Sequence, residues 1–237
     1  MKLFINVGGK GTRLGSLTQD VPKPMIPIHG KPVLEYLVMW AKANGMTDIV
    51  MLSGHLHEVI EDYFGDGEKF GVKISYSVES KPLGSGGAVR NARAYVDGTC
   101  CLISGDVICN INLSKMMKSH RTSKGAVMTI LVRESDHPHD SDILKVDDNN
   151  RVVKFIGKKE DHTGSGNLAN AGLFIIEPEV FDFMDDECFT FETYLFPKLL
   201  DAGMYLNTYI ANEYFFDMGT PERLEKAKKI LQERFRN

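Results

Sequence analysis

The chain has 237 residues, of which 43% are hydrophobic and 25% charged, and its formal net charge at pH 7 is −4. These values are ordinary for a globular protein that is long enough to bury a large core. The charge gives no basic footprint for nucleic acid, so an anionic ligand must be held by a local cluster of positive groups.

The first half of the chain alternates strand-like and helix-like patterns. Seven elements are expected, in chain order: a strand over 3–7, a helix over 33–44, a strand over 48–53, a helix over 57–64, a strand over 72–78, a helix over 86–96 and a strand over 99–104. This order predicts an α/β fold of Rossmann-like type, with a mostly parallel central sheet and helices on both faces.

The second half is richer in strand-like segments separated by turn signals. We expect strands over 126–132, 143–146, 151–156 and 168–176, and helices over 191–200 and 222–235. The pattern predicts a β-rich substrate lobe within one domain of residues 1–237, with halves 1–110 and 111–237.

Neither the cysteines nor the apolar segments point to an extracellular or membrane protein. The four cysteines form no CxxC pair and are expected to be reduced and mostly buried; they are Cys100, Cys101, Cys109 and Cys188. No apolar stretch approaches the ~20 residues of a membrane span, and no signal peptide is evident. We expect a cytoplasmic protein that binds neither membrane nor nucleic acid.

A glycine-rich segment with two cations, Lys10 and Arg13, follows the first expected strand. Glycines there let backbone N–H groups approach an anion closely. The segment is not a Walker A loop, which would need glycine in place of Phe4, nor a dinucleotide fingerprint, which would need glycine in place of Leu14. A turn that binds nothing is the alternative, but Lys23 between two prolines adds a third cation nearby.

Several segments together resemble the sugar-phosphate nucleotidyltransferases, also called sugar-nucleotide pyrophosphorylases. They cover nearly the whole chain: 8–14 followed by 22–25, then 82–88, 104–106, 152–158 and 216–221. Each segment alone is weak evidence for the family, whereas the combination of all of them is specific to it. The chain departs from the family pattern at Val7, Gly157 and Lys159.

The resemblance implies transfer of a nucleotidyl group from a nucleoside triphosphate to a sugar 1-phosphate, with release of pyrophosphate and with Mg²⁺ as cofactor. Residues 1–110 would bind the nucleotide and 111–237 the sugar phosphate. Catalytic roles are implied for Arg13, Lys23, Asp106 and Asp217, of which the two aspartates would bind the metal. The implied nucleotide-binding residues are Gly8, Gly9, Gly11, Thr12, Arg13, Lys23, Glu79, Pro82, Gly84, Ser85, Gly87 and Asp106. The implied substrate-binding residues are Gly105, Lys158, Asn170, Gly172, Glu192 and Asp217.

Glu79, just before the expected base-binding loop, suggests GTP as the nucleotide. A carboxylate can accept hydrogen bonds from both N1–H and N2–H₂ of guanine, which uracil and thymine cannot offer together. The segments look most like bacterial guanylyltransferases that act on heptose 1-phosphate or mannose 1-phosphate. UTP, CTP and dTTP remain alternatives, as does a solvated Glu79 with no part in base recognition.

Other functions and sites are kept open. A nucleotide-sugar-binding regulatory protein without catalysis and a phosphocholine cytidylyltransferase are the rival functions. Two histidine pairs, His55 with His57 and His137 with His139, lack further ligands at metal-site spacing. A homo-oligomer is compatible with the sequence, which does not specify the assembly.

Overall fold

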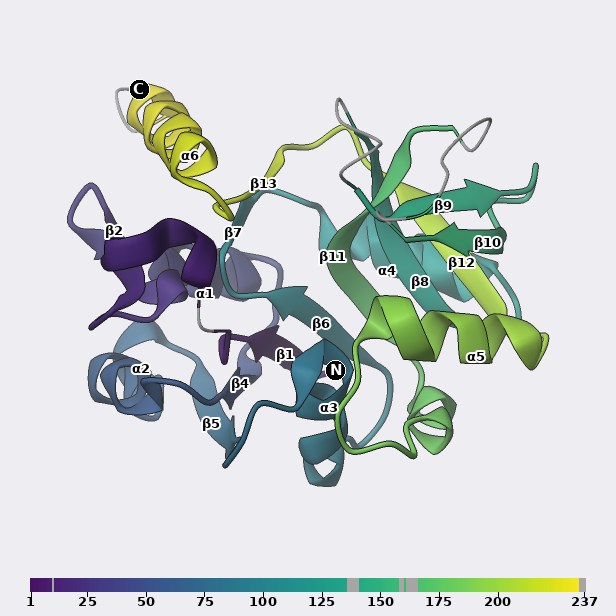
Figure 1. Cartoon of the computed structure of the whole chain (residues 1–237), viewed down its shortest axis with the longest axis horizontal. Helices are drawn as coiled ribbons and strands as arrows, with labels where there is room; N and C mark the ends of the chain where they lie inside the picture. Colours follow the sequence, from purple (N-terminus) through teal and green to yellow (C-terminus); the bar gives the residue numbers. More distant parts are fainter. Residues whose placement is uncertain (10, 136–140, 158–159, 161–165, 235–237) are drawn as a thin grey trace. The chain divides into compact units, whose positions relative to one another are not determined.

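The structure is a computed structural model that describes residues 1–9, 11–135, 141–157, 160 and 166–234 (Figure 1). The chain forms two compact units, each built from separate stretches. The unit that we call the parallel-sheet unit comprises Lys2–Pro82, Ile103–Ile111 and Glu213–Asn237. The mixed-sheet unit comprises Met1, Leu83–Leu102 and Asn112–Asn212. Both units therefore draw residues from both sides of the expected boundary at 110/111.

The core of the parallel-sheet unit is a buried parallel sheet of β1 (Leu3–Asn6), β4 (Asp48–Ser53) and β5 (Lys73–Val78). β4 is paired with β1 on one side and β5 on the other. The connections run through α1 (Val33–Ala43) and α2 (His57–Phe64), as expected for β-α-β units. The α/β fold class is confirmed.

α1 shows how the sequence fixes an element in this unit. It follows Pro32, whose ring suits the start of a helix, and it ends before Gly45, which adopts a positive φ of 76°. Its apolar side chains are almost all buried, and the indole Nε1 of Trp40 donates to the Ile111 carbonyl at 3.0 Å. Burial of a tryptophan with its polar atom paired stabilises the helix against the core.

Smaller elements complete the parallel-sheet unit. A two-stranded antiparallel ribbon joins β7 (Val107–Cys109) to β13 (Phe215–Asp217), and a hairpin joins β2 (Pro27–Ile28) to β3 (Lys31–Pro32). The helical elements are η1 (Thr12–Thr18), η2 (Lys23–Met25), η3 (Glu68–Phe70) and α6 (Pro221–Arg234). β6 (Cys100–Ser104) contributes its last two residues to this unit.

The mixed-sheet unit contains a sheet of order β10-β9-β11-β8-β12. Its strands are β8 (Ala126–Glu134), β9 (Ile143–Val146), β10 (Val152–Ile156), β11 (Leu168–Ile176) and β12 (Tyr205–Ile210). All pairs are antiparallel except β8 with β12, which is parallel. The predicted β-rich lobe in the second half is thus confirmed.

The helical elements of the mixed-sheet unit are short. They are α3 (Gly84–Asn91), η4 (Arg93–Tyr95), α4 (Leu113–Thr122), η6 (Pro178–Phe183), the π-helix η7 (Phe191–Leu195) and α5 (Phe196–Asp201).

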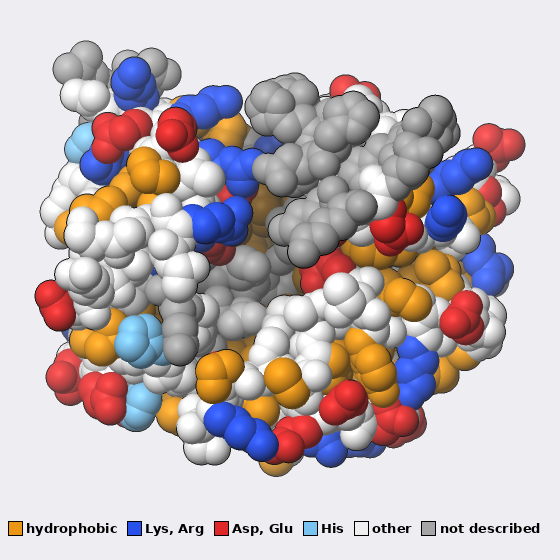
Figure 2. All heavy atoms as spheres, viewed as in Figure 1, with side chains coloured by type: hydrophobic (Ala, Val, Ile, Leu, Met, Phe, Trp, Pro, Cys, Tyr) orange, Lys and Arg blue, Asp and Glu red, His pale blue; other side chains and the backbone are white. Residues whose placement is uncertain are grey.

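The charged surface matches the small net charge. On the face drawn in Figure 2, basic and acidic side chains are interspersed rather than gathered by sign. Among the described residues, no helix combines the length and the apolar character that crossing a bilayer requires.

Candidate active site

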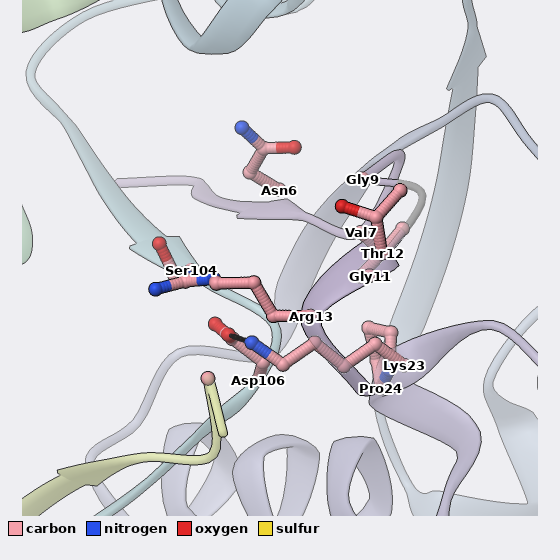
Figure 3. A pocket seen from close by; sticks show the side chains of 11 residues that line it. Asn6, Val7, Gly9, Gly11, Thr12, Arg13, Lys23, Pro24, Ser104 and Asp106 are labelled. Atoms are coloured by element: carbon pink, nitrogen blue, oxygen red, sulfur yellow. Dashed lines mark hydrogen bonds and ion pairs between the residues drawn. The ribbon is translucent and has the colours of Figure 1, made fainter. Parts of the chain in front are cut away.

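A cavity of about 300 Å³ lies in the parallel-sheet unit, beyond the carboxyl ends of β1 and β6 (Figure 3). Such an edge is where open α/β sheets bind ligands, and the volume is at the lower end of small-molecule sites. Six of the residues that the sequence singles out line it: Gly9, Gly11, Thr12, Arg13, Lys23 and Asp106.

Two glycines of the glycine loop, Gly9 and Gly11, have different surroundings. Gly11 has a positive φ of 63°, and a Cβ on it would lie 2.9 Å from Thr18 Cγ2 and 3.1 Å from Lys23 Cβ. Thr18 Oγ1 also donates to the Gly11 carbonyl at 3.2 Å. A Cβ on Gly9 would instead meet nothing within 4 Å, so the loop backbone there stays accessible to a ligand. Lys10 lies outside the described residues.

Lys23 and Asp106 form an ion pair at the floor of the cavity (Figure 3). Pro22 is extended and Pro24 fixes the first turn of η2, so the lysine is held by a stiff backbone. The side chains are only 11% and 21% exposed, respectively. Two opposite charges that are mostly withdrawn from water are mutually stabilising, and each becomes costly if its partner is removed.

The second aspartate, Asp217, lies on the strand that pairs with the segment after Asp106. Asp217 is opposite Val107 in the β13–β7 register, and Met218 N donates to the Asp106 carbonyl at 3.0 Å. Its carboxylate accepts from Gly219 N at 2.9 Å and from one guanidinium nitrogen of Arg223 at 2.9 and 3.0 Å. The structure therefore brings the two predicted metal ligands onto neighbouring backbone segments.

Arg13 lies close to this aspartate pair. A Cβ on Gly219 would be 2.7 Å from Asp217 Oδ1 and 3.2 Å from Arg13 Nη2. In Figure 3 the Lys23 side chain points to Asp106, and the Arg13 side chain extends across the same cavity toward Ser104. The cavity is thus lined by the cations Arg13 and Lys23 and by the carboxylate of Asp106, and Asp217 with its partner Arg223 lies next to Gly219 at its edge.

The two aspartates suit Mg²⁺ but not a closed protein cage. Within the described part of the chain, no group of three or more His, Cys, Asp and Glu is arranged to hold a metal. Mg²⁺ commonly uses only one or two carboxylates and takes its other oxygens from phosphates and water. Asp106 and Asp217 fit that requirement, because both carry hard oxygens on adjoining segments.

Glu79 lies over the glycine loop, at the carboxyl end of β5. Its backbone N donates to the Ser53 carbonyl at 2.8 Å. A Cβ on Gly54 would be 2.7 Å from Glu79 Cγ, and one on Gly8 would be 3.3 Å from Glu79 Oε1. The two glycines therefore make room for a half-buried carboxylate beside the loop. Pro82, also in this unit, is exposed.

The predicted base-binding glycines lie in the mixed-sheet unit, where they pack against the segment 187–189. Gly86 N and Gly87 N both donate to the Phe189 carbonyl, at 3.0 and 3.3 Å. A Cβ on Gly84 would lie 2.4 Å from that same carbonyl oxygen, and one on Gly87 would lie 2.3 Å from the Glu187 oxygen. These glycines are required by packing, and two of their N–H groups are already used.

Three predicted sugar-phosphate residues meet in the mixed-sheet unit. Asn170 Nδ2 donates to Glu192 Oε1 at 3.3 Å, and Asn170 Oδ1 accepts from Gly172 N at 3.0 Å. Gly172 has a positive φ of 79°. Lys158 lies outside the described residues.

Gly105 has a structural reason to be glycine. Its N–H donates to the Asn6 carbonyl at 2.8 Å, and a Cβ would lie 2.6 Å from Val7 Cγ1. This close contact fixes the segment just before Asp106.

Among the described residues, no histidine belongs to a group of three or more side chains that could hold a metal. His57 lies on α2, where its ring nitrogens contact Glu61 at 2.8 Å and Glu58 at 3.2 Å. His137 and His139 lie outside the described residues.

Five further residues line the cavity, namely Asn6, Val7, Pro24, Ser104 and Gly219. Pro24, Ser104 and Gly219 lie inside the predicted motifs, although none was assigned a role. Asn6 and Val7 directly precede the glycine loop, so extending that motif by two positions finds them. Arg223 offers no such signal, because an arginine in the first turn of a helix is ordinarily a solvated residue.

The chain matches a family model described as nucleotidyl transferase over residues 3–234. It is 34% identical to D-glycero-alpha-D-manno-heptose 1-phosphate guanylyltransferase of Aneurinibacillus thermoaerophilus, over 98% of this chain and 99% of that protein. It is 36% identical to the mannose-1-phosphate guanylyltransferase of Mycobacterium tuberculosis, over 95% of this chain and 63% of that protein.

A relative with another nucleotide matches as well. The chain is 33% identical to the UTP–glucose-1-phosphate uridylyltransferase of Synechocystis, over all of this chain but only 65% of that protein. Among solved structures, it is similar to HddC from Yersinia pseudotuberculosis complexed with GMP-PN, with a TM-score of 0.82 and 27% identity. That match covers 97% of this chain and 99% of the other.

Proposed function

This chain belongs to the nucleotidyl transferase family, and we propose that it transfers a guanylyl group from GTP to a sugar 1-phosphate of the manno-configured group, with release of pyrophosphate. The observation that carries the proposal is the cavity in which Arg13, Lys23, Asp106 and the neighbouring Asp217 converge. Two highly charged anions must meet in such a reaction, so fixed cations and a metal site are its main requirements.

The cationic side chains supply positioning and charge neutralisation. Arg13 offers a planar fork of donors suited to the β- and γ-phosphates, and Lys23 provides a point charge for the α-phosphate region. The sugar phosphate is itself an ionised nucleophile near neutral pH, so no general base is required. Mg²⁺ held by Asp106 and Asp217 would neutralise charge on the reacting phosphates.

Glu79 supports guanine as the base. Its carboxylate lies beside Gly8 of the phosphate-binding loop. The relatives from Aneurinibacillus and Mycobacterium are named guanylyltransferases, which agrees with this choice. The Synechocystis relative is named a uridylyltransferase, so transfer of UMP to a sugar 1-phosphate is the second candidate.

We assign recognition of the sugar 1-phosphate to residues of the second half of the chain. Asn170 and Glu192 form a hydrogen-bonded pair that can direct polar atoms at sugar hydroxyls, and Lys158 remains our candidate for the sugar phosphate. The heptose 1-phosphate and mannose 1-phosphate named in two relatives favour a manno-configured sugar.

A substrate panel tests the proposal. The protein is incubated with Mg²⁺, each of GTP, UTP, CTP and dTTP, and 1-phosphates of mannose, D-glycero-D-manno-heptose and glucose, with phosphocholine as a further acceptor. We expect pyrophosphate release only with GTP and a manno-configured 1-phosphate. Preference for UTP would reverse the base assignment alone, whereas no release in any combination would refute nucleotidyl transfer and favour a binding protein.

A further inference from the structure

Two segments of the mixed-sheet unit are joined by backbone hydrogen bonds. One is the predicted base loop at the start of α3, and the other is the turn that precedes η7. Phe189 N donates to the Leu83 carbonyl at 3.0 Å, and the Phe189 carbonyl accepts from both Gly86 N and Gly87 N. A Cβ on Gly86 would lie 2.2 Å from the Phe189 ring. The two segments are therefore held in a fixed register, with no room for them to slide.

A side chain extends this connection to the sugar-binding candidates. Ser85 Oγ accepts a hydrogen bond from Phe191 N at 3.2 Å. Phe191 is the first residue of the π-helix η7, so its N–H has no partner within that helix. Phe191 is 1% exposed, and its ring stacks on Phe174 with ring centroids 5.3 Å apart, which fixes the backbone at this point.

The next residue, Glu192, completes a continuous path. It accepts from Asn170 Nδ2 at 3.3 Å, and Asn170 in turn accepts from Gly172 N. Ser85, in the predicted base loop, is thus separated from Glu192, a predicted sugar-binding residue, by one hydrogen bond and one peptide unit. A π-helix that begins at such a point is a feature often found at functional sites.

We propose that Ser85 is a positioning residue that couples nucleotide binding to alignment of the sugar 1-phosphate, through Phe191 N and Glu192. The proposal rests on the proposed function. When the base occupies the loop around Ser85, the serine is held in place, and the start of η7 is held with it. Glu192 and Asn170 then face the acceptor in one arrangement, so the acceptor binds more tightly to the nucleotide-bound protein.

Three variants distinguish a loss of coupling between nucleotide and sugar 1-phosphate binding from a loss of folding stability. Ser85→Ala removes the acceptor of the Phe191 N–H, and Ser85→Thr keeps a hydroxyl. Thr190→Ala is the matched control, because Thr190 Oγ1 accepts from Thr193 N at 3.2 Å and so caps the same helix without touching the base loop. Circular dichroism establishes that each variant is folded. If Ser85→Ala does not fold, Ser85→Cys takes its place, since sulfur retains the volume and accepts only weakly.

The measurement is the affinity for the sugar 1-phosphate with and without a saturating α,β-methylene analogue of the preferred triphosphate. We expect the analogue to strengthen binding in the wild type, and Ser85→Ala to reduce that factor by about 3- to 10-fold, the range of one lost hydrogen bond. Ser85→Thr and Thr190→Ala should change it less than about 2-fold. Equal coupling in Ser85→Ala and wild type, or equal losses in Ser85→Ala and Thr190→Ala, would overturn the positioning role while catalysis persists. A wild type that transfers no nucleotidyl group would overturn the proposed function together with this role.

Discussion

Asp106 and Asp217 each have a cation at hand, but the two pairs differ in environment. Asp106 is paired with Lys23, and both are mostly buried, whereas Asp217 and Arg223 are 44% and 42% exposed. An exposed pair contributes little to stability and exchanges partners easily. Pairing with Arg223 therefore contributes little to the stability of the fold, and exchanging the arginine for the proposed metal would cost Asp217 little.

Alanine at either aspartate should nearly abolish turnover. Asp106→Ala and Asp217→Ala each remove one of the two carboxylates proposed for the metal, so we expect kcat to fall by roughly 10³-fold or more, or about 4 kcal/mol of transition-state stabilisation. Asp182→Ala is the control, because it loses only an exposed ion pair with Arg93. Near-normal kcat for either site variant at saturating Mg²⁺ would contradict the assignment.

The cysteines should differ sharply in reactivity. Burial raises the pKa of the Cys100 and Cys109 thiols to about 12, so almost no thiolate is present at pH 8, and Cys101 is fully buried. Cys188 is exposed. We expect one thiol to react with Ellman's reagent within minutes in the native protein and four in denaturant. Cys188→Ser should remove the fast reaction, and rapid labelling of a second thiol would contradict the burial.

At the scale of elements, α1 and α2 are joined through a single buried carboxylate. Glu35 Oε2 accepts from Tyr63 Oη at 2.6 Å, and Glu35 Oε1 contacts Lys31 Nζ at 2.8 Å. Burial raises the pKa of Glu35, but hydrogen bonds from Lys31 and Tyr63 outweigh it and hold the pKa below its usual range. The hydrogen bond to Glu35 is also the main cause that raises the pKa of Tyr63 to about 12.

Replacing this carboxylate should change the pH dependence of stability. Because the folded-state pKa of Glu35 is lowered, its contribution is present above the unfolded pKa of about 4.3 and is lost as pH falls through the lower folded value. We expect Glu35→Gln to reduce the free energy of unfolding by about 1–2 kcal/mol at pH 7, with the difference shrinking below about pH 4. Urea unfolding at several pH values measures this, with the exposed Glu58→Gln as control. A difference that persists unchanged at pH 3 would contradict the ionic contribution.

The long periodic elements were predictable from sequence, whereas two helices differ from the prediction, one because of a proline and the other because of contacts with a distant segment. The expected helix over 191–200 divides into a π-helix and α5, because Pro197 has no N–H to donate to the carbonyl four residues before it. The expected helix over 86–96 starts at Gly84 and ends at Asn91, since contacts with Phe189 fix its first turn. Such contacts come from more than 90 residues away and leave no local pattern.

Part of the candidate site was likewise predictable from sequence, and part was not. The cluster of Gly9, Gly11, Arg13 and Lys23 was predictable because its residues are close in sequence and chemically unusual together. The ribbon that brings Asp217 beside the segment after Asp106 was not, since β7 and β13 are three residues each and too short for any periodicity.

At the scale of the whole molecule, the proposed recognition tasks divide only partly between the two units, because the predicted base loop 84–87 belongs to the mixed-sheet unit. The phosphate-binding and metal-binding candidates, with Glu79, belong to the parallel-sheet unit, and the sugar candidates Asn170 and Glu192 belong to the mixed-sheet unit. Each unit is assembled from separated stretches of chain, because the segments 103–111 and 213–237 pack with residues 2–82 rather than with their neighbours in sequence. A cut at residue 110 would therefore divide both units rather than separate two tasks.

Nucleotide binding should be visible in the thermal stability of the intact chain. A ligand at about 100 times its Kd stabilises the folded state by about 2.7 kcal/mol, which for a chain of this length corresponds to a Tm increase of roughly 5–10 °C. We expect this increase with GTP and Mg²⁺. If Glu79 provides tenfold to hundredfold discrimination, UTP at the same concentration should stabilise by only about 0.4–1.4 kcal/mol.

The variant Glu79→Gln tests whether Glu79 causes the expected difference between stabilisation by GTP and by UTP. Glutamine keeps the volume that Gly8 and Gly54 accommodate, but its single carbonyl oxygen cannot accept from both guanine donors as a carboxylate does. Differential scanning fluorimetry should therefore show a GTP-dependent Tm increase that falls toward the UTP value in Glu79→Gln, while the stability without nucleotide stays close to that of the wild type. Equal increases with GTP and UTP in the wild type would contradict base selection by Glu79. A full GTP advantage in the variant would instead move that selection to other groups, and the glycine loop would remain the phosphate site in both cases, because neither outcome depends on Gly9, Arg13 or Lys23.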